Sequence, residues 1–242
     1  MVFDPPVIAH RGASAYAPEN TLAAFTRAAL LGVRWVEFDV MLSADGYPIV
    51  FHDERLERTT NGHGCVNTYP YAMLRTLDAG AWFHPRFASE PIPLLTVVLA
   101  FLQQAQLSAN IELKPLPGQE QALVRHTMQA IQAMPIAPAT SLLFSSFSVP
   151  ALTYLHQRFP TVIKGLLIDE WDPACLSTCK MLRCASLHAN HEIVNKERAK
   201  EIASQHLQLL CYTVNDSSRA KELYSWSVNA VFSDVPDQII SR

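Results

Sequence analysis

The chain has 242 residues, of which 49% are hydrophobic and 17% are charged, so it can bury a sizeable core. A formal net charge of −3 argues against nucleic acid or an anionic membrane surface as the partner. Residues 1–6 lack the features of a signal peptide, and the longest apolar stretch, 94–102, is too short to span a bilayer, so we expect a cytoplasmic protein without membrane insertion.

Short apolar runs alternate with amphipathic helical patterns along the whole chain. Several helices have clear start signals, such as Asn195 and Asp216. Eight strands that alternate with helices imply parallel pairing, so the pattern predicts the α/β class and a closed (β/α)8 TIM barrel, as a single domain over 1–242. In chain order the expected elements are strand 7–10, helix 21–31, strand 34–41, helix 94–105, strand 108–114, helix 119–133, strand 140–146, helix 149–158, strand 163–169, helix 173–182, strand 184–189, helix 196–205, strand 207–214, helix 217–226, strand 229–233 and a last turn after Pro236.

The region between the second strand and the second helix departs from this alternation. Residues 48–52 form a ninth apolar run, and the turn signal at 43–46 predicts that it folds back on the second strand as a hairpin. Residues 54–92 then form a long excursion rich in Gly, Pro and aromatic residues. Loops of this length are usually functional, so we expect a small insertion that acts as a lid or selects the substrate.

Ionisable side chains interrupt the apolar runs, and most lie at or near the carboxyl ends of predicted strands. Burying them without partners would be costly. Catalytic groups gather at this end of barrel strands, and two residues two apart on one strand face the same side. The pattern therefore predicts one shared site in an enzyme, formed by His10, Glu37, Asp39, His52, Glu112 and Lys114.

These residue types indicate phosphoester chemistry. Glu37, Asp39 and Glu112 cannot easily all stay ionised side by side without a cation, and hard oxygen ligands select Mg²⁺ or Ca²⁺. Arg11 and Lys114 beside such a cation would bind a phosphate. The two histidines would supply a general base and a general acid.

A series of short motifs, in order and over essentially the whole chain, resembles the glycerophosphodiester phosphodiesterase family. Chain length and the stretch 187–191 are similar to cytosolic bacterial members. One departure is Tyr212, where many relatives carry Trp. The matching motifs are His10-Arg11-Gly12, Pro18-Glu19-Asn20-Thr21, Glu37-x-Asp39, Asp45-Gly46, His52-Asp53, Arg58-Thr59-Thr60, Glu112-Leu113-Lys114, Tyr212-Thr213-Val214-Asn215 and Ser233-Asp234-Val235-Pro236.

The resemblance implies hydrolysis of a small glycerophosphodiester to sn-glycerol 3-phosphate and an alcohol. It makes the three carboxylates ligands of one divalent cation, with Mg²⁺ favoured and Ca²⁺ the alternative. His10 would take the proton of the glycerol 2-hydroxyl, His52 would protonate the leaving alcohol, and a cyclic 1,2-phosphate would form. Arg11 and Lys114 would neutralise the charge at phosphorus. The residues alone do not distinguish the roles of the two histidines.

Alternative interpretations stay open at this point. One is a lysophospholipase D-type enzyme on the same barrel, and another is a non-catalytic barrel that binds a phosphorylated metabolite. Glu37 and Asp39 could instead form a structural cluster of ion pairs with Arg34 or Lys114. Head-group preference and oligomeric state cannot be derived from the sequence.

Some neighbouring residues have structural alternatives. Asn20 or Thr21 is expected to cap the first helix, with bracing of Arg11 or His10 as a second role for Asn20. Asp53 is expected to orient His52 or to hold the hairpin. Aromatic residues at 82, 83, 147 and 212 are candidates for the pocket wall or the core. A zinc site of Cys175, Cys179 and Cys184 with His188 and His191 is weighed against packing thiols, and packing is favoured.

Overall fold

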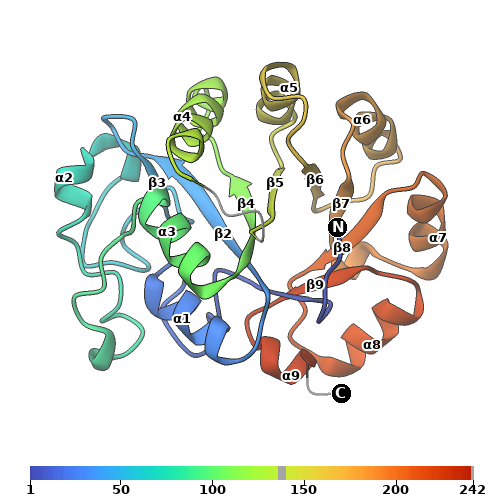
Figure 1. The fold of residues 1–242 in the computed structure, drawn as a ribbon, viewed down its shortest axis with the longest axis horizontal. Helices are drawn as coiled ribbons and strands as arrows, with labels where there is room; N and C mark the ends of the chain where they lie inside the picture. Colours follow the sequence, from blue (N-terminus) through green and yellow to red (C-terminus); the bar gives the residue numbers. More distant parts are fainter. Residues whose placement is uncertain (136–139, 241–242) are drawn as a thin grey trace.

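The computed structural model describes residues 1–135 and 140–240, and these form the predicted barrel (Figure 1). Neighbouring barrel strands are parallel, and β1 pairs with both β2 and β9, which closes the sheet. Each predicted barrel strand is found with its bounds shifted by at most two residues. The barrel strands are β1 (Val7–Ala9), β2 (Trp35–Leu42), β4 (Ser108–Leu113), β5 (Leu142–Ser146), β6 (Lys164–Ile168), β7 (Ser186–Asn190), β8 (Gln208–Tyr212) and β9 (Ala230–Ser233).

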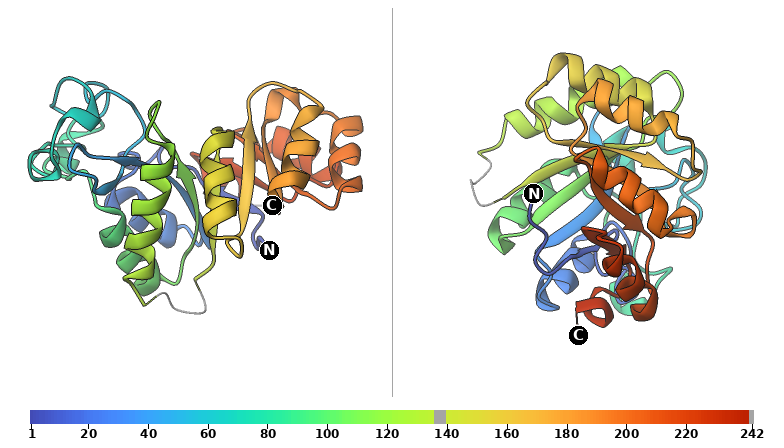
Figure 2. Two further views of the ribbon diagram at one scale, coloured as in Figure 1. Left: turned by 90° about the horizontal axis from the view of Figure 1, so that it is seen from above. Right: turned by 90° about the vertical axis from the view of Figure 1, so that its right-hand side faces the viewer.

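Helices surround the barrel and cover the outer faces of the strands (Figures 1 and 2). The predicted helical segments are all confirmed, and the Asn195 and Asp216 side chains cap α7 and α8 as expected. In the described residues no helix is long and apolar enough to cross a membrane. The helices are α1 (Leu22–Leu30), α3 (Leu95–Ala105), α4 (Glu120–Gln132), α5 (Val149–Arg158), α6 (Ala174–Leu182), α7 (Lys196–Ser204), α8 (Ser217–Ser225) and α9 (Pro236–Ile240).

The barrel strands are buried on both faces, which explains why charged residues stand out in their sequences. On β2 all eight residues are buried. Its outward residues, such as Val36 and Phe38, pack in the main hydrophobic core beneath the helices. Inside the barrel, a smaller apolar cluster that includes Trp35, Leu210 and Phe232 fills one end. The polar residues of β2 therefore face the interior, next to this apolar cluster.

The region between β2 and α3 contains the expected hairpin, followed by the irregular segment 54–92. Strand β3 (Pro48–Val50) pairs antiparallel with β2, as predicted for 48–52. The segment 54–92 contains the short elements η1 (Val66–Thr68), α2 (Tyr71–Leu74) and η2 (Pro85–Phe87). Its apolar residues form their own cluster with residues of β2 and β3. Figure 1 shows this segment to one side of the barrel, beside β3, and its role as a lid or selector stays a prediction.

Candidate active site

Three carboxylates converge inside the barrel at the positions predicted from the sequence. Strand β2 carries Glu37 and Asp39, and Asp39 lies opposite Glu112 in the register between β2 and β4. One ligand oxygen of each residue lies within 4.8 Å of the others. Among the residues that the structure describes, this is the one such group of three or more potential metal ligands. The chemistry of an all-carboxylate donor set suits a hard divalent cation.

The three carboxylates differ in charge state because their neighbours differ. Burial, and then repulsion from Asp39, raises the pKa of Glu112 to about 8. Burial and repulsion from the other two carboxylates also raise the pKa of Glu37 well above its usual range. Burial opposes ionisation of Asp39 as well, but Arg11 and Lys114 outweigh it and lower the pKa of Asp39. The cluster therefore holds one stable carboxylate and two groups whose ionisation would be favoured by an added positive charge.

Asn20 supports this cluster through contacts with Asp39 that were not expected from the sequence. Its side chain donates from Nδ2 to Asp39 Oδ2 at 2.9 Å and accepts from the Asp39 backbone N–H at 3.3 Å. Its positive φ of 58° places the side chain in this position. The cap of α1 is Thr21. Asn20 thus braces Asp39, which the sequence did not indicate. Of the two partners expected from the sequence, Arg11 is contacted through the backbone, where the Asn20 N–H donates to the Arg11 carbonyl at 3.0 Å.

His10, directly after β1, is held by the end of the last strand. Its Nδ1 donates to Asp234 Oδ1 at 2.7 Å. Ser14 Oγ also lies 2.8 Å from this oxygen, and Asn215 Nδ2 donates to Asp234 Oδ2 at 2.7 Å. Burial alone would raise the pKa of Asp234, but these hydrogen bonds lower it far below its usual range. An ionised Asp234 fixes the ring of His10 and leaves Nε2 as its free nitrogen.

His52, after β3, is held in the same way by its neighbour Asp53. The distance from His52 Nδ1 to Asp53 Oδ1 is 2.5 Å, so Asp53 orients His52, which is one of the two roles expected from the sequence. Burial lowers the pKa of His52, an effect that Asp39 partly offsets. The ring therefore has one nitrogen fixed by a carboxylate and the other available to a molecule in the barrel.

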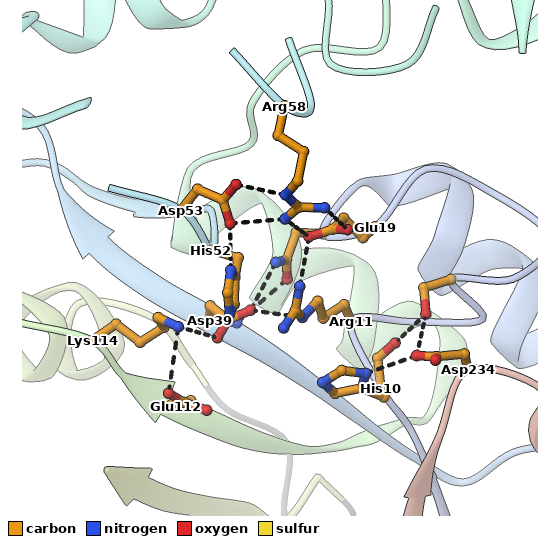
Figure 3. Close-up of polar contacts among 12 residues, drawn as sticks. His10, Arg11, Glu19, Asp39, His52, Asp53, Arg58, Glu112, Lys114 and Asp234 are labelled. Carbon is orange, nitrogen blue, oxygen red and sulfur yellow. Dashed lines mark hydrogen bonds and ion pairs between the residues drawn. The ribbon is translucent and has the colours of Figure 1, made fainter. Parts of the chain in front are cut away.

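The two predicted phosphate-binding cations lie against the acidic cluster (Figure 3). Arg11 Nε is 3.5 Å from Asp39 Oδ2, and Arg11 also donates its backbone N–H to Glu37 Oε2 at 2.9 Å. Lys114 Nζ lies 3.7 Å from Asp39 Oδ1 and 3.8 Å from Glu112 Oε1. The three distances from the charged groups to carboxylate oxygens are longer than direct hydrogen bonds, so the side chains of Arg11 and Lys114 balance the charge of the cluster without being hydrogen-bonded to it.

The two histidines, the two cations and two of the three carboxylates line one cavity of about 260 Å³. Its polar side contains both histidines, both cations, Glu37 and Glu112, and its apolar side contains Phe147, Leu167, Tyr212 and Phe232. The Phe147 and Tyr212 rings meet edge to face with centroids 6.0 Å apart. The arrangement offers an anionic ligand two cations and two histidine nitrogens, next to an apolar wall for a small organic group.

Comparisons with known proteins identify the family. Residues 10–238 match the model of the glycerophosphoryl diester phosphodiesterase family. The chain belongs to this family. It is 32% identical to a glycerophosphodiester phosphodiesterase of Caldanaerobacter subterraneus, over 97% of this chain and 96% of that protein. It is 31% identical to a glycerophosphodiester phosphodiesterase of Bacillus subtilis, over 95% of this chain and 83% of that protein.

A solved family structure is also very similar. An Oleispira antarctica phosphodiesterase in complex with the product sn-glycerol 3-phosphate has a TM-score of 0.95 and 38% identity, covering 98% of this chain and 96% of that one. Tyr212 lines the cavity wall and donates its hydroxyl to the Ile168 carbonyl at 2.7 Å. Its ring thus lies in the wall with its polar end satisfied.

The remaining expectations concern residues away from this cavity. Cys175, Cys179 and Cys184 are buried in the main core, as packing thiols would be. His188 faces the barrel interior, where its Nε2 lies 2.9 Å from Ser186 Oγ. Trp82 and Phe83 pack against each other within 54–92 and are absent from the cavity lining given above.

Sequence reasoning missed three supporting residues. Asp234 was quoted only as part of a motif, although a barrel that closes between β9 and β1 brings it to His10. Glu19 and Arg58 were likewise matched without a role. Glu19 and Arg58 bind each other and other residues of the site. Both lie in loops, where no periodic pattern indicates which residues a side chain will contact.

Proposed function

We propose that this protein hydrolyses glycerophosphodiesters to sn-glycerol 3-phosphate and an alcohol. One observation carries the proposal. Two histidines line the same cavity, each with Nδ1 held by a carboxylate, and a carboxylate cluster with two cations lies beside them. This is an arrangement for moving two protons around an anionic centre. The small molecule named in the Oleispira complex has the size and charge for which such a cavity is suited.

Glu37, Asp39 and Glu112 would hold one divalent cation, with Mg²⁺ favoured and Ca²⁺ the alternative. The fit is supported by the all-carboxylate donor set and by Glu37 and Glu112, whose pKa values are raised by burial and by repulsion from neighbouring carboxylates. When bound, the cation supplies Lewis-acid polarisation of a phosphoryl oxygen and of the glycerol 2-hydroxyl.

The chain's own residues perform the proton transfers. His10 takes the proton of the glycerol 2-hydroxyl through Nε2 as that oxygen attacks phosphorus, and Asp234 stabilises the imidazolium that results. His52 gives a proton to the oxygen of the leaving alcohol. A cyclic 1,2-phosphate remains, and a water molecule opens it with the roles of the two histidines reversed, which regenerates both rings.

Arg11 and Lys114 stabilise the charge that develops on the phosphoryl oxygens. Both are already close to carboxylates, so their charges are oriented before the substrate binds. The apolar wall, including Phe147 and Tyr212, would contact the carbon skeleton of glycerol and exclude water from that side.

The test is release of glycerol 3-phosphate from glycerophosphocholine by the purified protein after EDTA treatment, with Mg²⁺ or Ca²⁺ then restored. We expect activity to disappear with EDTA and to return with Mg²⁺. Lysophosphatidylcholine, assayed in parallel, separates a lysophospholipase D. No product from either substrate with either metal would refute the proposed reaction.

A further inference from the structure

Arg58 lies in the segment 54–92, and its guanidinium binds two carboxylates at once (Figure 3). Toward Asp53, Nε is 2.6 Å from Oδ2 and Nη2 is 2.8 Å from Oδ1. Toward Glu19, Nη1 is 2.7 Å from Oε2 and Nη2 is 2.7 Å from Oε1. Both ion pairs are bidentate. Only the planar guanidinium of an arginine has enough donors, in fixed directions, to form both pairs at the same time.

Each of these carboxylates has a second partner that lines the cavity. Asp53 Oδ1 contacts His52 Nδ1 at 2.5 Å, and Glu19 Oε1 accepts from Arg11 Nη1 at 2.8 Å. The four residue pairs, Arg58 with Asp53 and with Glu19, Asp53 with His52, and Glu19 with Arg11, connect three separate parts of the chain. These parts are the loop after β1, the residues after β3, and the segment 54–92. Arg58 itself is 46% exposed and is not part of the cavity lining, and it is connected to the lining residues His52 and Arg11 through Asp53 and Glu19.

We propose that Arg58 is a positioning residue, which fixes His52 through Asp53 and Arg11 through Glu19. The roles of His52 and Arg11 rest on the proposed function, whereas the connection between them rests on the contacts alone. The segment 54–92 thus contributes to catalysis through the side chain of Arg58, near the start of the segment.

The physical reason is the proximity of two like charges. Glu19 Oε1 and Asp53 Oδ1 both contact Nη2, so the two carboxylates lie within two hydrogen-bond lengths of each other. Their side chains are only 12% and 23% exposed, so water screens them weakly. Without the guanidinium they would repel each other, and each could turn away from the residue it holds. A lysine would supply the charge but could not bind both carboxylates bidentately.

The test compares Arg58→Lys and Arg58→Met with Arg55→Met, all assayed with saturating Mg²⁺ on glycerophosphocholine. Arg55 is a matched control, because it is an exposed arginine in the same loop that pairs with Glu57 away from the cavity. We expect both Arg58 variants to lose about ten- to hundredfold in kcat, the usual range for residues that orient functional groups, with a smaller change in KM. Thermal unfolding midpoints close to that of Arg55→Met would separate this loss from loss of folding.

A double-mutant cycle tests the route through Asp53. If Arg58 acts through Asp53, Arg58→Met combined with Asp53→Asn should cost little more kcat than the worse single variant. Losses that multiply, or wild-type kcat in Arg58→Lys, would overturn the inference.

Imidazole ¹⁵N NMR gives a readout that does not depend on activity. Signals are assigned with His10→Gln and His52→Gln. Arg58→Met should shift the ring signals of His52 and leave those of His10 in place, since His10 is held by Asp234. Unchanged His52 signals would overturn the inference. Shifted signals in a protein that hydrolyses no glycerophosphodiester would refute the proposed function alone.

Discussion

Replacing Asn20 should weaken both the fold and the acidic cluster, because one side chain braces Asp39. A hydrogen bond to a charged group contributes about 1.5–3 kcal/mol, and the Asp39 side chain is only 2% exposed, so water cannot replace the donor. Alanine at the positive φ of 58° adds about 1–2 kcal/mol. Asn20→Ala should therefore lower the free energy of unfolding by about 3–4 kcal/mol, which corresponds to a fall of roughly 10 °C in Tm for a chain of this size.

Asn20→Gly separates the two contributions. Glycine accepts a positive φ without strain but also lacks the side-chain hydrogen bonds, so it should recover about 1 kcal/mol relative to Ala. Both variants should bind Mg²⁺ about ten- to hundredfold more weakly than wild type, since Asp39 is no longer held. Thermal unfolding in EDTA measures the first effect, and calorimetric titration with Mg²⁺ measures the second.

Asn195→Ala is the matched control. Asn195 accepts a hydrogen bond from the backbone N–H of Arg198 at the start of α7, far from the cluster in the chain. Losing this cap should cost about 1 kcal/mol and leave Mg²⁺ affinity unchanged. The reasoning would be refuted if both Asn20 variants were as stable as Asn195→Ala and bound Mg²⁺ as tightly as the wild type. In that case the hydrogen bonds from Asn20 to Asp39 would contribute neither to folding nor to metal binding.

Three further outcomes are expected. His10→Ala and His52→Ala should each reduce kcat about 10²–10⁴-fold while calorimetry shows Mg²⁺ binding retained; lost metal binding would contradict their assignment as proton-transfer groups. Gly12→Ala should lower Tm, because a Cβ at this residue (φ +82°) would lie 2.6 Å from a side chain of α1; an unchanged Tm would show that the loop relaxes. The pKa of Glu112 is raised to about 8, so this group holds a proton at neutral pH in the metal-free protein, and the pKa of Glu37 is raised in the same direction. Mg²⁺ should therefore displace protons and bind more tightly as the pH rises through about 8. Titrations in buffers of different ionisation enthalpy measure this release, and a pH-independent affinity would argue against these ligands. By the same sign, Glu112, whose pKa is raised on folding, stabilises the metal-free fold at low pH and loses that contribution as the pH rises through about 8.

The barrel could be predicted from the sequence because its signals are local. Each strand is short and apolar, and each helix has a period and often a cap, so the alternation could be read along the chain. The inward direction of Glu37 and Asp39 followed from strand geometry alone. The segment 54–92 could be recognised only as a departure, because its 3₁₀ turns and its small core have no periodic pattern.

The partners of the predicted site residues could not be predicted in the same way. Asp234 lies 224 residues from His10, and Arg58 lies 39 residues from Glu19. Such contacts depend on barrel closure and on how loops turn at the strand ends. Barrel closure could have indicated Asp234, since β9 must lie beside β1. The motif Arg58-Thr59-Thr60 distinguished Arg58 from Arg55, three residues earlier, but no local pattern indicated which carboxylates Arg58 would bind.

The charge distribution also explains why the acidic cluster is better understood as a binding site than as a structural network of ion pairs. Asp39 is fully supported by Arg11, Lys114 and Asn20, and its pKa is lowered accordingly. Glu37, which is buried, and Glu112, which is half-buried, lie beside it without comparable compensation, so in the metal-free protein they oppose folding once ionised. A network selected for stability would place neutral or paired side chains here, since removing buried charge is often stabilising. Two destabilised carboxyl groups beside one firmly ionised carboxylate instead favour binding of a cation, and the free energy they cost in its absence is regained when it binds.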